Sequence, residues 1–558
     1  MKTLKYIALS ILTFGMVACE NELVEDFRDL NANDDVVLEE LTVGDLDFSN
    51  YVAIGASFTA GYTDGGLFIA TQENSFPNLL AKQFEKVGGG SFTQPLMNDN
   101  FGGLILGGNP VISPITGDRL FTERLVFGGA GPVPLQAVNP SAMSTTDFAL
   151  NNPTGPFNNL GIPGAKSFHL IASGYGNISN FPAAANPYAI RVTGNNQNAS
   201  ILELAMAQNP TFFTLSEVGG NDVLGYATSG GESDIDAPNY DPITDSATFD
   251  FAFNNLITAL TSNGAKGVVT TVPDITSLSH FTTVPYNPIT PDALGDQISL
   301  LNQVYGAINQ IYIGAGEPER AIVFSSTEAS PVVIIDEDAT DLTLAITTTL
   351  GSSPTFVPFV QSLGLPAAAA PLVAQLLGQQ YGKARSATEN DLFVLPSSSI
   401  IGEVNAEHVV SLITESGGLL PQTLAGTFAV EGITLPLEDK WVLTPEEQQE
   451  IANATAAYNT TIIDVADANP NVAVADLRAV LEQAAISGYT YDEFVMNTDL
   501  VFGGLVSLDG IHLTSRGYGL MAREFLAAID AAFGSNFIAS GSTPVAADLP
   551  TNYSATLQ

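Results

Sequence analysis

The fold is decided by the stretch Tyr51-Val52-Ala53-Ile54-Gly55-Ala56-Ser57-Phe58-Thr59-Ala60-Gly61. Its apolar first part, residues 51–54, is typical of a short buried strand, and the small residues that follow predict a turn with Ser57 at its tip. Ligands of open α/β sheets bind beyond the carboxyl ends of the strands, so this serine is placed for nucleophilic chemistry. A serine that only caps a helix is the commoner use of such a turn, and the rest of the chain must decide between the two.

Composition and charge exclude two classes of protein. The chain has 558 residues, of which 45% are hydrophobic, and this is enough for a large buried core. Its 17 Lys and Arg stand against 59 Asp and Glu, and the net charge of -42 would repel phosphates, so no nucleic-acid partner is expected. Charged residues make up only 14% of the chain, which argues against an intrinsically disordered protein.

The N-terminus has the pattern of an export signal. Residues 1–18 combine Lys2 and Lys5 with an apolar run that is too short to span a membrane comfortably. The only cysteine of the chain, Cys19, follows directly, and the segment resembles a bacterial lipoprotein signal peptide. That resemblance implies lipidation of Cys19, a membrane partner through the lipid anchor, and a place in the cell envelope as an outer-membrane lipoprotein.

Residues 19–47 are acidic and predict a solvated tether. An acidic segment after such a cysteine also resembles the surface-export signals of some Bacteroidetes lipoproteins.

Strands and helices alternate along most of the remaining chain. Besides the opening stretch, apolar runs predict buried strands at residues 211–216, 266–272 and 472–477. Helical spacing and capping patterns predict helices at residues 75–84, 201–207, 251–262 and 445–466. Such alternation is typical of an α/β fold with a doubly wound parallel sheet.

Two segments interrupt this alternation within a domain that we expect to span residues 48–535. The first, near 87–156, is rich in Gly, Pro and Asn and predicts long loops with short strands. The second, near 327–445, either caps the mouth of an active site or packs its helices on the side of the domain. Both insertions are expected to supply the walls of a substrate pocket. Residues 536–558 are expected to form a C-terminal tail.

Two acidic loops, at residues 229–250 and 336–341, are candidate calcium sites by composition alone. Neither has the ligand spacing, glycine and terminal glutamate of an EF-hand loop. We therefore expect solvated surface loops there, and no metal or other cofactor.

Histidine is rare, and one histidine has a suitable partner. The chain contains His169, His280, His408 and His512. Only His512 follows an acid, Asp509, by three residues in a glycine-containing turn. This spacing lets the carboxylate hold one imidazole nitrogen, which leaves the other nitrogen free to accept the proton of a serine. The other three histidines are expected to be surface or packing residues.

Four blocks of sequence together resemble the SGNH or GDSL hydrolases. They occur in the order of that family and span most of the mature chain: Gly55-Ala56-Ser57-Phe58, Ile162-Pro163-Gly164-Ala165, Gly219-Gly220-Asn221-Asp222 and Asp509-Gly510-Ile511-His512. Segments at 75–77 and 271–274 also look like those of lipoprotein members from Bacteroidetes. One position departs from the family pattern, because Ala56 stands where the family has the Asp of its GDSL block.

The resemblance implies a three-layer α/β/α, flavodoxin-like fold with large loop insertions. It implies Ser57 as the nucleophile, His512 as the base and then the acid, and Asp509 as the residue that orients the imidazole. The oxyanion hole would consist of the backbone N–H groups of Ser57 and Gly164 and the side-chain amide of Asn221. The Gly-x-Ser-x-Gly signature of the α/β-hydrolases is absent at this serine.

The function implied by this resemblance is carboxylic ester hydrolysis through an acyl-enzyme, by an esterase or a lipase-like enzyme without metal or organic cofactor. The substrate would be a lipid, an acetylated glycan or a small ester. Two other functions remain open, because a fold does not fix a function. One is an inactive envelope lipoprotein that binds a partner with the same fold. The other is an acyltransferase that passes the acyl group to a sugar hydroxyl.

Overall fold

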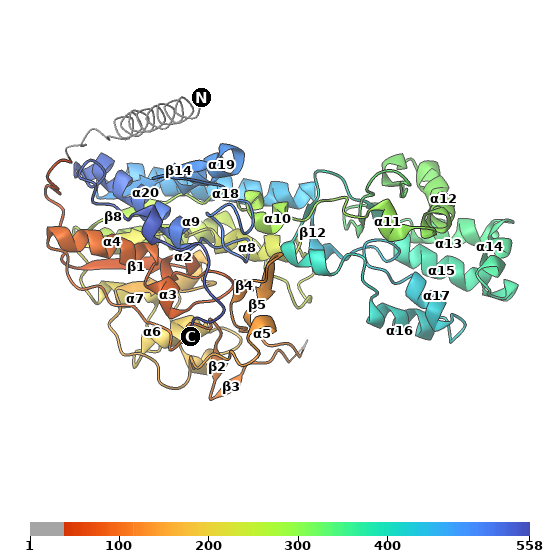
Figure 1. Cartoon of the computed structure of the whole chain (residues 1–558), viewed down its shortest axis with the longest axis horizontal. Helices are drawn as coiled ribbons and strands as arrows, with labels where there is room; N and C mark the ends of the chain where they lie inside the picture. The colour runs from red at the N-terminus through yellow and green to blue at the C-terminus, as the bar shows by residue number, and fades with distance from the viewer. Residues whose placement is uncertain (1–37, 115–116) are drawn as a thin grey trace, which may run out of the picture.

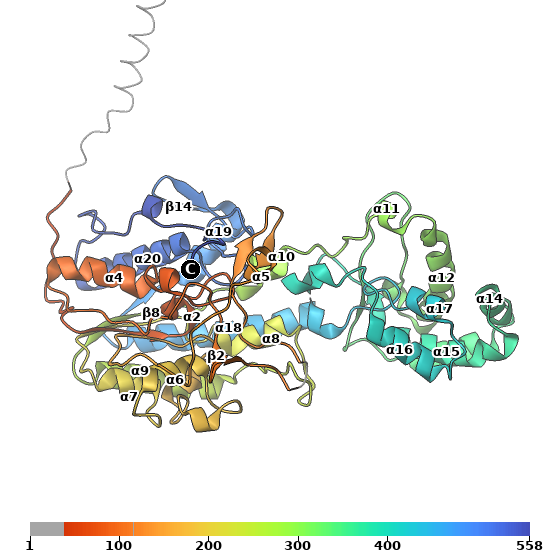
Figure 2. The same cartoon turned by 60° about the horizontal axis from the view of Figure 1, so that its bottom comes forward.

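The computed structural model describes residues 38–114 and 117–558, and it consists of two lobes (Figure 1). The predicted signal peptide 1–18, Cys19 and the first part of the predicted tether therefore lie outside the described residues. The larger lobe contains a parallel sheet with helices on both faces. The smaller lobe is helical, and Figure 2 shows it projecting from one end of the larger lobe.

A five-stranded parallel sheet forms the centre of the larger lobe. Its order is β13-β8-β7-β1-β6, with the strands β1 (Tyr51–Gly55), β6 (Asn159–Gly161), β7 (Phe212–Leu215), β8 (Lys266–Thr270) and β13 (Val472–Ala475). All five residues of β1 are buried, because helices cover both faces of the sheet; this explains a continuous apolar run without alternation. The prediction of a parallel α/β fold is confirmed, and so are four of its strands.

Helices pack on both faces of this sheet (Figure 2). On one face lie α4 (Phe76–Phe84), α19 (Leu477–Ser487) and α20 (Ser515–Phe533). On the other face lie α7 (Ile201–Met206), α9 (Ser246–Thr261) and α18 (Pro445–Asp467). The start of α18 follows the predicted cap, since Thr444 and Glu447 form a capping box. The helix α9 begins earlier than predicted, because the side chain of Asp245 accepts a hydrogen bond from the N–H of Thr248 and caps it.

The first predicted insertion consists of loops with short strands, as expected. Between α4 and β6 the chain forms the hairpins β2 (Ile105–Leu106) with β3 (Asn109–Pro110) and β4 (Leu125–Phe127) with β5 (Pro132–Pro134), and one short helix, α5 (Leu135–Val138). These elements lie together below the sheet in Figure 1.

The second predicted insertion is part of a larger helical lobe with its own core. The buried residues of this core run from Val284 to Val442, so the predicted beginning at residue 327 is wrong. The reason is α12 (Gln297–Ala315), whose buried Tyr305 and Ile308 pack in the core of this lobe and not on the sheet. The other helices of the lobe are α11 (Pro291–Leu294), α13 (Thr343–Ser352), α14 (Phe356–Ser362), α15 (Ala370–Tyr381), α16 (Ala406–Glu415) and α17 (Gln422–Thr427).

Two neighbouring helices of this lobe are long and apolar enough for a membrane segment only when they are counted together. Within residues 38–114 and 117–558, no single helix is long and apolar enough to cross a membrane. The segments Phe356–Ser362 and Ala367–Tyr381 pass the same test as a pair, and they are bent by 117°.

The segments expected to be a tail and a tether pack against the larger lobe. Phe537 and Leu549, in the predicted tail 536–558, are buried. The side chain of Arg124 donates a hydrogen bond of 2.7 Å to the carbonyl oxygen of Ser554 and so fixes the end of the chain. At the other terminus the N–H of Thr42 donates to the Oδ1 atom of Asn536 at 2.7 Å. The described part of the tether therefore belongs to the folded body, because it pairs with the C-terminal segment.

Asp439, where the chain returns from the helical lobe, makes the free energy of unfolding depend on pH. Both of its carboxylate oxygens are buried without a hydrogen-bond partner. Burial, together with the nearby acids Glu447, Glu337, Glu232 and Asp336, raises the pKa of Asp439 to about 9. A carboxyl with a raised pKa in the folded state stabilises the fold least at high pH, because unfolding lets it ionise. This contribution is complete below pH ~4 and is lost as the pH rises to about 9.

We therefore expect Asp439→Asn to reduce the fall in melting temperature between pH 6 and pH 9, because the amide stays neutral throughout. Thermal unfolding followed by circular dichroism at both pH values measures this. Asp292→Asn, at an exposed position of the same lobe, is the control and should retain the wild-type fall. Equal pH dependence in Asp439→Asn and the wild type would show that the carboxyl is ionised in the folded protein.

Candidate active site

The candidate nucleophile lies at the start of a four-residue helix that follows the central strand. β1 ends at Gly55, and α2 (Ser57–Ala60) begins directly after Ala56. Only glycine fits at position 55, because a Cβ atom there would lie 2.1 Å from Oγ1 of Thr59. The tight turn places Ser57 at the carboxyl edge of the sheet, where the residue is 6% exposed.

The sheet order brings the three predicted oxyanion-hole segments to the same edge. β1 lies between β6 and β7, so the residues that follow these three strands are neighbours. Nδ2 of Asn221 donates a hydrogen bond of 3.0 Å to the carbonyl oxygen of Ala165, next to Gly164. The carboxylate of Asp222 accepts hydrogen bonds from the backbone N–H and the hydroxyl of Ser167, at 2.9 and 2.7 Å. The loops after β6 and β7 are thereby fixed to each other.

Asp509 and His512 form the predicted pair. Nδ1 of His512 lies 2.9 Å from Oδ2 of Asp509. The same oxygen accepts a hydrogen bond from the N–H of Gly65 at 2.8 Å. Oδ1 accepts from the N–H groups of Ile511 and His512, at 2.9 and 2.8 Å, and from the hydroxyl of Ser507 at 3.1 Å. Burial opposes ionisation, but the neighbouring imidazole and these hydrogen bonds prevail and lower the pKa of Asp509. The carboxylate is therefore charged at neutral pH.

The imidazole of His512 packs against the helix that carries the serine. Its ring centroid lies 5.9 Å from that of Phe58 and 4.6 Å from that of Tyr62. In the described part of the chain, no hydrogen bond joins Oγ of Ser57 to this imidazole. Catalytic hydrogen bonds of ligand-free hydrolases are often long and shorten when substrate binds. The contact with Phe58, the residue after Ser57, is what links the imidazole to the helix of the serine.

The remaining histidines, predicted to be surface or packing residues, are all buried or half-buried. The N–H of His280 donates to the carbonyl oxygen of Gly510 at 3.0 Å. Residue 510 must be glycine, since its φ is +77° and a Cβ atom would lie 2.8 Å from the nitrogen of His280. The ring of His169 stacks on Tyr175 at 4.5 Å. His408 lies in the helical lobe on α16.

The turn after α2 holds the Asp509 turn in place, and the sequence analysis missed this role. The hydroxyl of Thr63 donates to the carbonyl oxygen of Leu513 at 2.7 Å. The carboxylate of Asp64 accepts a hydrogen bond of 3.0 Å from the N–H of Leu508. Burial raises the pKa of Asp64 to about 7. The dipeptide Asp64-Gly65 is a turn signal, but nothing in the sequence indicates which segment the turn contacts.

Glu217 is a second functional candidate that the sequence analysis missed. It follows β7, has a φ of +52°, and accepts a hydrogen bond of 2.8 Å at Oε1 from the N–H of Phe58. The helix α2 has no side-chain cap of its own, since its N-cap residue is Ala56. Glu217 therefore caps the serine's helix from the neighbouring strand. Burial raises its pKa well above the ordinary value, and Oε2 has no hydrogen-bond partner.

We expect Glu217→Ala to slow the reaction of Ser57 with a fluorophosphonate about 10-fold or more, because loss of an N-terminal cap costs about 1–2 kcal/mol and loosens the turn. Glu217→Gln keeps the acceptor for the N–H of Phe58 and resembles the neutral acid, so its rate should stay near that of the wild type. Labelling rates and melting temperatures of both variants test this. A wild-type rate in Glu217→Ala would show that the cap does not position the serine.

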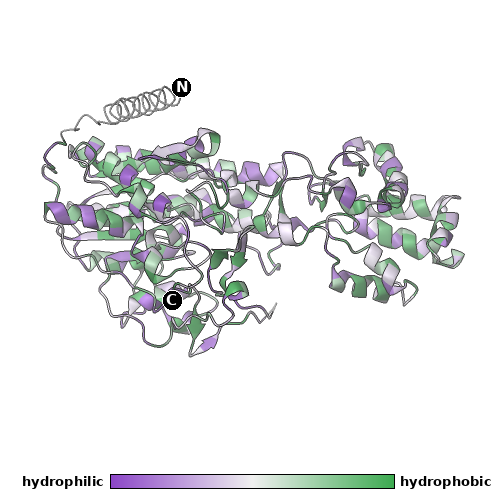
Figure 3. Cartoon of the chain, in the orientation of Figure 1, coloured by the Kyte–Doolittle hydropathy of each residue, from purple (hydrophilic) through white to green (hydrophobic). Residues whose placement is uncertain are grey.

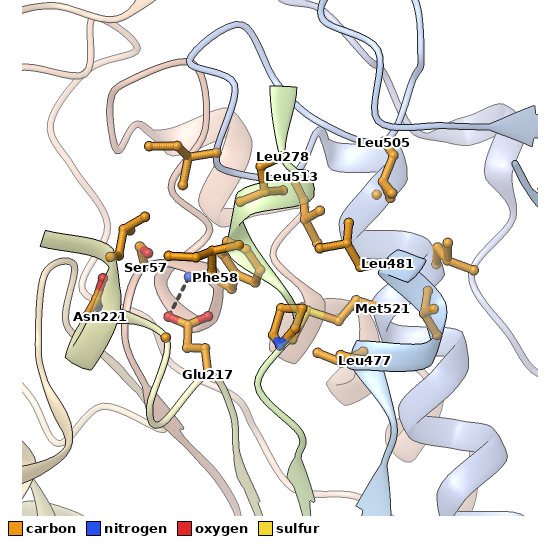
Figure 4. A pocket seen from close by; sticks show the side chains of 18 residues that line it. Ser57, Phe58, Glu217, Asn221, Leu278, Leu477, Leu481, Leu505, Leu513 and Met521 are labelled. Carbon is orange, nitrogen blue, oxygen red and sulfur yellow. Dashed lines mark hydrogen bonds between the residues drawn. The ribbon is translucent and has the colours of Figure 1, made fainter. Parts of the chain in front are cut away.

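A largely apolar cavity opens beside the serine (Figure 4). It has a volume of about 850 Å³, which includes the part open to solvent. Its lining residues come from α2, the loops after β7 and β8, α8 (Asn221–Thr228), α19, α20 and the segment before α20. Neither residues 87–156 nor the helical lobe lines it, so the prediction that the insertions form the pocket walls is wrong for this cavity. The walls are core elements, because α19 and α20 pack beside the strand ends.

No metal site was found in the described segments 38–114 and 117–558, where no group of three or more His, Cys, Asp or Glu side chains could hold an ion. The chain was also compared with known proteins. No family model, no curated protein and no solved structure matches it. The functional proposal therefore rests on the sequence and the geometry of this chain.

Proposed function

We propose that this protein is a serine ester hydrolase of the SGNH type, with the three-layer α/β/α architecture of that family. One observation carries the proposal. An ionised Asp509 holds Nδ1 of His512, and the imidazole packs against the short helix that begins with Ser57 at the edge of a cavity. A carboxylate, an imidazole and a hydroxyl in this relation are the parts of a nucleophilic triad.

The chemistry would proceed in two halves. His512 donates its Nδ1–H to Asp509, so Nε2 is free to accept the hydroxyl proton of Ser57. Oγ then bonds to the carbonyl carbon of the ester, and the bond to the alcohol breaks while His512 returns the proton to the leaving oxygen. Water, activated by the same imidazole, attacks the acyl-enzyme, releases the carboxylic acid and restores the serine.

Negative charge develops on the carbonyl oxygen in both halves. The N–H groups of Ser57 and Gly164 and the amide of Asn221 would stabilise it. One hydrogen of that amide already bonds to the carbonyl of Ala165, which fixes the side chain and leaves the second hydrogen for the oxyanion. Each such donor contributes about 3 kcal/mol of transition-state stabilisation.

The cellular location of the protein is part of the proposal. Cys19 would carry a lipid after removal of residues 1–18, and this would anchor the enzyme as an outer-membrane lipoprotein. The support is the sequence alone, because these residues lie outside the described segments.

Covalent labelling separates this function from its two rivals. We expect a fluorophosphonate to label Ser57, and peptide mapping should find the adduct there. An inactive binding lipoprotein would not be labelled. An acyltransferase would be labelled, but its turnover of an aryl ester would depend on an added sugar acceptor, whereas a hydrolase needs only water.

A further inference from the structure

We propose that the cavity beside Ser57 binds the acyl chain of the substrate, and that the protein hydrolyses esters of medium-chain and long-chain fatty acids. This inference rests on the proposed function and names its substrate class. It selects among the lipid, acetylated glycan and small esters that the sequence leaves open.

The polarity of the lining is the first argument. Eighteen residues line the cavity, and only Ser57, Glu217 and Asn221 among them have polar side chains. In Figure 4 these three lie on one side, whereas Leu477 and Met521 lie on the other. The remaining lining side chains are apolar or absent. A sugar would leave its hydroxyl groups without partners on such a surface. A hydrocarbon chain suits the chemistry of this lining.

The position of His512 is the second argument, because it separates the acyl side from the alcohol side. His512 must protonate the leaving alcohol, so the alcohol lies near the imidazole. Its chain neighbours Ile511 and Leu513 line the cavity, but His512 does not. The alcohol therefore leaves on the side of the imidazole, away from the cavity. The other substituent of the carbonyl carbon, which stays bound to Ser57, is the acyl chain.

The burial of the wall opposite Ser57 is the third argument. Leu481 of α19 and Met521 of α20 are buried, so the far wall belongs to the core of the larger lobe. A chain that enters there transfers its methylene groups from water to hydrocarbon surroundings. Each buried methylene raises affinity roughly fourfold. The specificity constant should therefore rise with acyl length until the cavity is full.

The test compares kcat/KM for p-nitrophenyl acetate, octanoate and laurate with the full chain. We expect octanoate to exceed acetate by at least ~100-fold, a conservative figure for six added methylene groups. Leu477→Trp adds volume at the far wall from a half-buried position, and the ratio of laurate to acetate should fall at least ~10-fold. Ile486→Trp is the matched control on the same helix, since Ile486 is 78% exposed and outside the cavity, and the ratio should not change.

Two results would overturn the inference while the hydrolase function stands. One is a preference for acetate together with an unchanged ratio in Leu477→Trp. The other is a rate that rises with the length of the alcohol, as in octyl acetate, and not with that of the acyl chain. If no ester is hydrolysed and Ser57 is not labelled, the proposed function fails and the substrate class with it. Displacement of a fluorescent fatty acid from Ser57→Ala then shows whether the cavity nevertheless binds a hydrocarbon chain.

Discussion

Ser57→Ala is expected to lower kcat for aryl ester hydrolysis about a millionfold, to the level that the oxyanion donors alone support. The reason is that no other hydroxyl lines the cavity, so no second serine, threonine or tyrosine can replace Oγ as the nucleophile in the described structure. The fold should persist, because alanine fits wherever serine fits and Oγ makes no hydrogen bond that holds α2 within the described segments. The measurement combines aryl ester kinetics, fluorophosphonate labelling and a melting curve.

Ser173→Ala is the matched control. Ser173 is exposed, its hydroxyl donates to the carbonyl oxygen of Asn198, and it does not line the cavity. It should retain the wild-type kcat and the wild-type labelling. Hydrolysis at more than a small fraction of the wild-type rate in Ser57→Ala would mean that another group is the nucleophile, and the proposed function would have to be abandoned.

The core of the fold could be predicted from the sequence because its strands are buried on both faces. Such strands are continuous apolar runs, as in β1 and β13, and these runs stand out from their surroundings. The edge strand β6 could not be predicted in this way. Its residues Asn159, Leu160 and Gly161 have no strand-forming pattern, and the segment is a strand only because β1 lies beside it.

The candidate site could be predicted in part. Asp509 and His512 are three residues apart, so one local turn brings them together and their spacing predicts the contact. Glu217 and Asp64 act across long sequence separations, on Phe58 and Leu508. Their roles depend on which strands and turns become neighbours, and no local pattern encodes that.

The walls of the cavity and the beginning of the helical lobe could not be predicted for the same reason. Loops on a rigid scaffold commonly form binding sites, so the insertions were reasonable candidates for the walls. The apolar side chains of α19 and α20 read in the sequence as ordinary core residues, because the pattern of a helix facing a cavity equals that of a helix facing a core. The helical lobe begins before residue 327 because α12 packs inside it, and helical spacing does not reveal the packing partner.

Asp509→Asn is expected to lower kcat about 10⁴-fold while leaving Ser57 in place. Oδ1 accepts hydrogen bonds from the N–H groups of Ile511 and His512, so the amide oxygen of the variant takes this position. The amide NH₂ then takes the position of Oδ2, where it faces Nδ1 of His512 at about the present 2.9 Å. A donor at that place forces Nδ1 to become an acceptor. The proton moves to Nε2, and the imidazole can no longer accept the proton of the serine.

Asp509→Asn should also lower the free energy of unfolding, and the pH dependence of this loss follows from the pKa of Asp509. A lowered pKa in the folded state stabilises the fold above the ordinary pKa of an aspartate, and this contribution is lost as the pH falls. Asp509→Asn should therefore melt below the wild type at pH 7, with a smaller difference at pH 3. Asp499→Asn, at an exposed position nearby in the sequence, is the control for both readouts. A kcat within tenfold of the wild type in Asp509→Asn would show that the imidazole keeps its tautomer without the carboxylate, and the triad would reduce to Ser57 and His512.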